Sequence, residues 1–224
     1  MSEPHVTPYG PVANVYDAFM TLTGFKRGVE NFLDRIDFAV PGGGRILDAG
    51  CGTGLLTFYL ARRFPAASIT ATDIDPAMLR ELARLREEHG FARERIAIGV
   101  SDLNAPAEIR LLGASAHATL SRGSLDAVVV SGALEHVALD TAMPRLVELL
   151  KPGGTFFALS MRRNPVGAAL GMIYHCKPYT LPEMRSAAGR AGLDDIRVVR
   201  LGTEDFPANL SRVAILARKA ADTL

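Results

Sequence analysis

The chain has 224 residues, a formal net charge of +1 at pH 7 and 48% hydrophobic residues. This length and composition suit a globular protein with a sizeable core, and we expect one domain over residues 1–224. A charge this close to zero gives no basic surface for nucleic acid, so nucleic acid is not expected as a partner.

Other global features narrow the class of protein. The two cysteines, Cys51 and Cys176, give neither a disulfide framework nor a metal site, so no metal is expected. The first ten residues lack a basic-then-apolar signal pattern. No apolar run approaches the ~20 residues that span a bilayer. We therefore expect a cytoplasmic protein without stable membrane insertion. The sequence does not indicate an oligomeric state.

The first half of the chain alternates helical and strand patterns. Apolar residues at helical spacing predict a helix over residues 25–36, which ends at "PGGG". The stretch "RILDAG" predicts a strand, and residues 53–63 return to a helical pattern. The β-branched residues of "SITATD" predict a second strand. Asp75 and Pro76 then resemble the N-cap and first turn of a helix that ends near Gly90.

The second half continues this alternation. "RIAIGV", "LDAVVVS" and "TFFALS" predict three more strands, with a helix over residues 140–150 before the last of them. Thr180 and Glu183 form a capping-box pattern, and "DIRVVRL" and "RVAILAR" follow as two strands without a helix between them. The prediction is an α/β, Rossmann-like, doubly wound sheet of about seven strands. It is mostly parallel with an antiparallel last strand, and helices cover both faces.

Two segments interrupt the alternation. Residues 103–124 are long for a connection between neighbouring strands. In residues 162–179, Asn164 and Pro165 predict the start of a helix whose apolar face would hold Val166, Leu170 and Ile173. The place of this second segment after the fifth strand suits a lid over a binding site.

The stretch "ILDAGCGTGLL" puts a glycine loop directly after a strand. In open α/β sheets, ligands bind beyond the carboxyl ends of the strands, where glycine lets the backbone approach closely. Gly50, Gly52 and Gly54 alternate, so the loop lacks the G-x-G-x-x-G spacing of dinucleotide sites. Asp48 beside the loop would suit a ligand with an ammonium group better than a pyrophosphate.

The line D-x-G-x-G-x-G resembles the first motif of class I S-adenosylmethionine-dependent methyltransferases. Asp73 at the end of the second strand, "SDLN", "VVVSGALEHV" and "LLKPGGTFF" resemble further motifs of this family. The resemblance covers roughly residues 25–160. It implies a methyltransferase domain that uses S-adenosyl-L-methionine, with S-adenosyl-L-homocysteine as the product.

The resemblance also implies roles for particular residues around the cofactor. The glycines would pack against its methionine and ribose, Asp48 would lie near its amino group, and Asp73 would accept both ribose hydroxyls. The remaining implied contacts are Ile74 and Leu103 on the adenine faces, Asp102 at the adenine edge, Ser131 near the sulfonium and Tyr16 closing over the site. The family's organisation divides the chain into an N-terminal helical cap (1–40), a cofactor-binding core (41–160), a substrate lid (161–180) and a closing helix with a strand pair (181–224).

The predicted reaction is in-line methyl transfer to an O, N or C atom of a small molecule. His136 is the candidate general base, because an imidazole titrates near neutrality. Tyr174 or His175, placed about 100° apart at the end of the predicted lid helix, would contact the acceptor. Apolar residues of the lid and the N-terminal region favour an apolar or aromatic acceptor.

Other functions remain open at this point. A nicotinamide-dependent oxidoreductase would share the fold, but it would need the missing glycine spacing. A nucleic-acid or protein methyltransferase lacks support from the charge, and "SGALEH" stands where an N-P-P-Y-like motif would be expected. A catalytically inactive cofactor-binding protein would retain the glycine loop.

Overall fold

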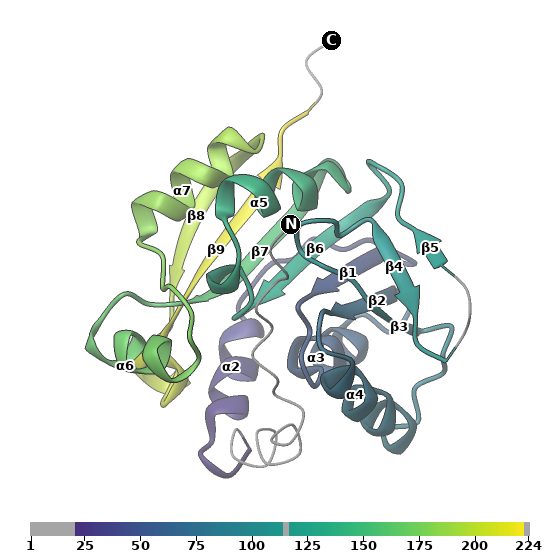
Figure 1. Ribbon diagram of the computed structural model, residues 1–224, viewed down its shortest axis with the longest axis horizontal. Coiled ribbons are helices and arrows are strands. Elements are labelled where there is room, and N and C mark those ends of the chain that lie inside the picture. The colour runs from purple at the N-terminus through teal and green to yellow at the C-terminus, as the bar shows by residue number, and fades with distance from the viewer. Residues whose placement is uncertain (1–20, 114–116, 222–224) are drawn as a thin grey trace.

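The computed structural model describes residues 21–113 and 117–221. Its centre is one sheet of nine strands in the order β5-β4-β3-β2-β1-β6-β7-β9-β8 (Figure 1). The middle of the sheet, from β3 through β7, is parallel, and β9 is antiparallel to both β7 and β8. The predicted fold class is therefore confirmed, including the antiparallel strand pair at the end of the chain.

All seven expected strands are present, and two more are added. In chain order the strands are β1 (Arg45–Ala49), β2 (Ser68–Asp73), β3 (Ile96–Val100), β4 (Glu108–Leu111), β5 (His117–Thr119), β6 (Leu125–Ser131), β7 (Leu150–Met161), β8 (Leu193–Arg200) and β9 (Arg212–Lys219). The α-helices are α2 (Phe25–Leu33), α3 (Leu55–Arg63), α4 (Pro76–Glu88), α5 (Leu139–Glu148), α6 (Pro165–Ile173) and α7 (Leu181–Arg190).

Helices cover both faces of the sheet, and each face has its own core. Figure 1 shows α2, α3 and α4 on one side and α5 and α7 on the other. The first core joins residues of α2, α3 and α4, such as Phe32, Phe58 and Leu82, to one face of the strands. The second joins α5 and α7, through residues such as Leu146 and Met184, to the opposite face. The central strands are buried on both faces, as their continuous apolar runs predict.

Capping residues fix where the helices begin. The Asp75 carboxylate accepts a hydrogen bond from the Ala77 N–H at 2.8 Å, which confirms its predicted place at the start of α4. Thr180 and Glu183 form the expected capping box at the start of α7. Asn164 caps α6 by accepting from the Gly167 N–H at 2.8 Å, with Pro165 in the first turn. Each cap satisfies an N–H that the helix itself leaves unpaired.

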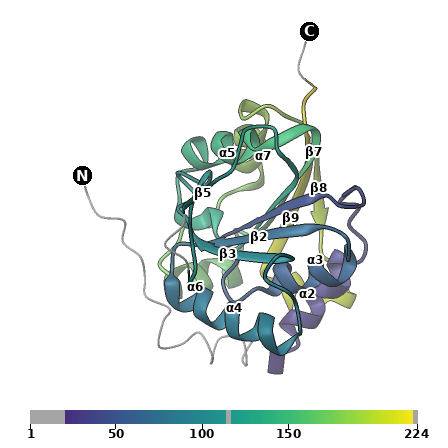
Figure 2. The ribbon, with the colours of Figure 1, turned by 90° about the vertical axis from the view of Figure 1, so that its right-hand side faces the viewer.

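The long segment after β3 contains β4 and β5, two strands that the sequence pattern did not predict. They extend the sheet antiparallel beyond β3 and lie on the right in Figure 1, the side that faces the viewer in Figure 2. Gly99 in β3 permits this addition, because a Cβ there would lie 2.3 Å from Cγ2 of Ile109 in β4. The strands have only four and three residues, so their pattern is too short to detect.

The predicted apolar face of α6 is largely exposed rather than buried. The buried residues of this helix are Gly167 and Gly171, whereas the Val166, Met172 and Ile173 side chains are 42%, 73% and 66% exposed. A Cβ on Gly167 would lie 1.8 Å from the carbonyl oxygen of Arg162. The glycine face therefore packs inward because backbone approaches it too closely for any side chain, and the apolar side chains point outward.

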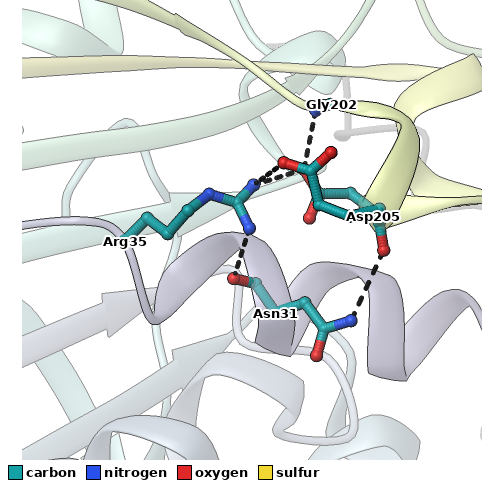
Figure 3. A network of polar contacts seen from close by, with 5 residues as sticks. Asn31, Arg35, Gly202 and Asp205 are labelled. Atoms are coloured by element: carbon teal, nitrogen blue, oxygen red, sulfur yellow. Dashed lines mark hydrogen bonds and ion pairs between the residues drawn. The ribbon is translucent and has the colours of Figure 1, made fainter.

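A polar network holds α2 against the connection between β8 and β9 (Figure 3). Arg35, just after the helix, donates to the fully buried Asp205 carboxylate at 2.6 Å, and the same oxygen accepts from the Gly202 N–H at 2.7 Å. Gly28 closes the contact, since a Cβ there would lie 2.4 Å from the Asp205 carbonyl oxygen. The network therefore fixes α2 against the turn Thr203–Asp205 in this connection.

None of the helices within the described ranges is long and apolar enough to cross a membrane. The same residues contain no group of three or more His, Cys, Asp or Glu side chains that could hold a metal ion.

Candidate active site

A cavity of about 730 Å³ opens beyond the carboxyl ends of β1, β2, β3 and β6. β1 continues into α3 on one face of the sheet, whereas β6 leads to α5 on the other face. Neighbouring strands whose connections leave on opposite faces create a crevice between them, which is where ligands bind in doubly wound sheets. The cavity therefore lies where the topology predicts a binding site.

The glycine loop forms one wall of this cavity. Gly50 and Cys51 donate their N–H groups to the Thr72 carbonyl oxygen at 2.7 and 2.9 Å, which ties the loop to the end of β2. Gly50 has φ +70°, and a Cβ there would lie 2.3 Å from that of Ala133. Gly52 has φ +55°, lines the cavity and has no atom within 4 Å of its Cβ position. Gly50 therefore permits packing, whereas Gly52 leaves space in the cavity itself.

Asp73 connects the glycine loop to the end of β2. One carboxylate oxygen accepts from the Gly52 N–H at 2.9 Å, and the other accepts from the Asp75 N–H at 2.9 Å. Burial raises the pKa of Asp73, and these backbone hydrogen bonds partly oppose that shift. An ionised carboxylate has about four lone-pair sites, so each oxygen keeps one for a ligand hydroxyl.

Asp48 lies at the base of the cavity on the central strand β1. One oxygen accepts from the Thr57 hydroxyl at 2.5 Å, while the other, Oδ1, is buried without a hydrogen-bond partner among the described residues. Burial raises the pKa of Asp48 to about 7, with a smaller contribution from the negative charge of Asp73. A cationic group nearby would favour the ionised form of this carboxylate.

The other predicted cofactor residues divide into two groups. Ile74, Asp102, Leu103 and Ser131 line the same cavity. Gly54 does not line it: a Cβ there would lie 2.8 Å from Leu82 Cδ1, so this glycine lets α3 start close to α4. The prediction for Tyr16 lies outside the described residues.

His136, Tyr174 and His175 line the same cavity, so the structure brings all three predicted catalytic residues together. The helical placement predicted for Tyr174 and His175 is wrong, because α6 ends at Ile173. His175 has φ +50°, and the next N–H, from Cys176, reaches back to the Gly171 carbonyl oxygen at 3.0 Å. This is the Schellman arrangement of helix ends, and it turns the chain toward the cavity.

Two charged residues that line the cavity, Glu135 and Arg212, were not predicted as site residues. Glu135 is 4% exposed; one of its oxygens accepts from the Met161 N–H, and the other has no partner among the described residues. Arg212, the first residue of β9, also lines the cavity. The sequence signal for Glu135 was its place in "GALEHV", beside the favoured His136. Arg212 gave no signal, because an arginine at a strand end usually lies on the surface.

Comparisons with known proteins point to one family. A family model described as a methyltransferase domain matches residues 47–156. The ubiquinone biosynthesis O-methyltransferase of Xanthomonas axonopodis pv. citri is 37% identical over 135 residues, which are 59% of this chain and 49% of that protein. These matches indicate a class I S-adenosylmethionine-dependent methyltransferase domain. The chain spans about half the length of the curated relatives it matches.

Solved structures show the same fold at low sequence identity. The geranyl diphosphate C-methyltransferase of Streptomyces coelicolor A3(2), in complex with Mg²⁺, geranyl diphosphate and S-adenosyl-L-homocysteine, has a TM-score of 0.68 and 15% identity. It covers 98% of this chain and 86% of its own. The [4+2]-cyclase SpnF has a TM-score of 0.65 and 17% identity, and the match covers 88% of this chain and 82% of the SpnF chain. Because one fold carries both reactions, the chemistry of this chain must be argued from its own site.

Proposed function

We propose that this chain transfers the methyl group of S-adenosyl-L-methionine to an O, N or C atom of a small apolar or aromatic molecule. The observation that carries the proposal is the hydrogen bond from the Gly52 N–H to the Asp73 carboxylate. It joins an open glycine wall and a diol-binding carboxylate in one cavity, which continues to His136. The names of the curated relatives are consistent with methyl transfer to a small molecule.

The cavity fits the cofactor in two ways. Gly52 leaves space that a side chain would fill, and Asp48 has a buried oxygen without a partner among the described residues. In this proposal Asp48 lies on the side of the cofactor's ammonium group, and Asp73 accepts both ribose hydroxyls. Ile74 and Leu103 then contact the adenine faces, with Asp102 at the adenine edge.

The remaining contacts concern the methyl group and its approach. Ser131, at the end of β6, would lie near the sulfonium, between the cofactor residues and His136. The organisation into cap (1–40), core (41–160), lid (161–180) and closing segment (181–224) is part of the same proposal.

The bound cofactor supplies an activated methyl group on a positively charged sulfur. The protein's own task is to hold the acceptor atom in line with that group, which can contribute several kcal/mol to catalysis. His136 is exposed at the end of the 3₁₀ turn Leu134–His136, so its imidazole can accept a proton from an acceptor hydroxyl or amine. In this proposal Tyr174 and His175, which line the cavity, contact the acceptor from the lid segment 161–180.

The test is calorimetric titration with S-adenosyl-L-homocysteine, combined with transfer of a labelled methyl group to a panel of aromatic hydroxyl and amine acceptors. Asp73→Asn removes charge from the proposed ribose contact, where hydrogen bonds to a charged group contribute about 1.5–3 kcal/mol each. We expect its affinity for the product to fall at least ~10-fold. Asp194→Asn, an exposed carboxylate on β8, is the matched control.

Two results would count against the proposal. Unchanged affinity in Asp73→Asn would contradict the ribose assignment. Binding of S-adenosyl-L-homocysteine without turnover on any acceptor would favour an inactive cofactor-binding protein instead.

A further inference from the structure

Arg212 is a buried cation in the cavity with an unused hydrogen-bond donor. The residue is 9% exposed, and its guanidinium nitrogen Nη1 is buried without a partner among the described residues. No ion pair within 4.0 Å joins Arg212 to a described carboxylate. An unsatisfied buried nitrogen of a charged group is costly, so its presence indicates that a ligand supplies the missing acceptor.

The surroundings hold the guanidinium in place. Its Cζ lies 5.4 Å from the centre of the Phe25 ring, at the start of α2. The Arg35–Asp205 network holds α2 against the connection that leads into β9, and the Ser211 carbonyl oxygen, directly before Arg212, accepts from the Arg162 N–H at 2.7 Å. A guanidinium fixed in this way is preorganised for a planar anion, because little side-chain entropy is lost on binding.

Glu135 does not neutralise Arg212. Both residues line the cavity, but Glu135 Oε1 accepts from the Met161 N–H and Oε2 has no partner within the described part of the chain. Burial raises the pKa of the Cys176 thiol; the charge of Glu135 raises it further, whereas the charge of Arg212 lowers it. The part of the cavity around Cys176 therefore contains two separate charges of opposite sign, those of Glu135 and Arg212.

We propose that Arg212 is a specificity-determining residue that binds a carboxylate on the methyl acceptor. The acceptor class is then an aromatic or apolar acid, whose body lies among the aromatic residues Phe25, Tyr174 and Tyr179 and whose anion pairs with Arg212. This inference rests on the proposed function and names its substrate class. A guanidinium and a carboxylate form two parallel hydrogen bonds, which gives orientation as well as affinity.

The test measures ligand preference in the presence of saturating S-adenosyl-L-homocysteine. Benzoate and the isosteric neutral benzamide are titrated into the wild-type protein, Arg212→Gln, Arg212→Lys and the control Arg197→Gln, an exposed arginine of β8. We expect the wild-type protein and Arg197→Gln to bind benzoate at least ~10-fold more tightly than benzamide. The preference for benzoate should vanish in Arg212→Gln. It should persist in part in Arg212→Lys, which keeps the positive charge but cannot form two parallel hydrogen bonds.

Several outcomes would overturn the inference. Equal affinities for benzoate and benzamide in the wild-type protein would do so without any variant, even if Arg212→Gln fails to fold. A preference that survives in Arg212→Gln would place the anion elsewhere. If Arg212→Gln instead lost affinity for S-adenosyl-L-homocysteine while keeping the preference, Arg212 would belong to the cofactor. Failure of the wild-type protein to bind S-adenosyl-L-homocysteine at all would contradict the proposed function. That result is distinguishable from a failure of the Arg212 assignment, which concerns only the preference for benzoate.

Discussion

Replacing Gly52 by alanine tests whether the open glycine wall is a ligand-binding surface. Gly52 has φ +55°, a conformation that costs an alanine about 1 kcal/mol. Its Cβ would meet no protein atom within 4 Å, so no further loss of stability is expected. The methyl group would occupy the cavity, and overlap with a ligand there costs about 1–3 kcal/mol. The affinity for S-adenosyl-L-homocysteine should therefore fall ~5- to 150-fold.

Two other glycines serve as matched controls. Gly90, after α4, has φ +72° and also has no atom within 4 Å of its Cβ position, but it does not line the cavity. Gly90→Ala should lose the same ~1 kcal/mol of unfolding free energy and keep full affinity. Gly50→Ala should be less stable by a further ~1–3 kcal/mol, because its Cβ would lie 2.3 Å from that of Ala133.

The assay combines urea unfolding with calorimetric titration of the three variants. Equal affinity of Gly52→Ala and Gly90→Ala for S-adenosyl-L-homocysteine would show that the glycine wall is not a ligand-binding surface. A much larger loss of stability in Gly52→Ala than in Gly90→Ala would show that the Gly52 Cβ clashes with the protein and not with a ligand.

Three further predictions concern charged and titratable groups. Because the folded pKa of Asp48 is about 7 and the unfolded value about 3.8, the unfolded state binds fewer protons between these values. The unfolding free energy should fall by up to about 4 kcal/mol as pH rises from 4 to 7, and urea unfolding of Asp48→Asn should show a flatter dependence. His136→Ala should lower kcat on an accepted substrate at least ~100-fold and leave S-adenosyl-L-homocysteine affinity unchanged; an unaltered kcat would remove this residue as the base. Arg35→Met, which leaves the buried Asp205 carboxylate without its cation, should cost about 1–3 kcal/mol after allowance for the 44% exposure of the arginine side chain; unchanged urea unfolding would contradict a stabilising role for the network.

The main features of the fold could be predicted from local patterns. The seven expected strands, the Asp75 cap and the Thr180–Glu183 capping box all depend on residues close together in the chain. β4 and β5 could not be predicted, because their stability comes from pairing to β3 rather than from their own short sequences. The buried face of α6 was also missed, because backbone contacts from Arg162 and Cys176, rather than side-chain hydrophobicity, determine it.

The cavity residues likewise divide into those that local sequence predicts and those that depend on contacts between distant parts of the chain. The glycine loop, Asp73 and Asp102 follow the ends of consecutive strands, so parallel pairing brings them to one edge of the sheet. Arg212 reaches the cavity only because β9 pairs antiparallel to β7, with Met161 opposite Arg212. That register joins parts of the chain far apart in sequence, and no local pattern around Arg212 reports it.

Calorimetric titration of the wild-type protein with S-adenosyl-L-homocysteine, with NADH as the control ligand, shows directly which cofactor the cavity binds. We expect saturable binding of S-adenosyl-L-homocysteine at one site and no binding of NADH. Binding of NADH alone would contradict this expectation, because the glycine loop would then hold a dinucleotide.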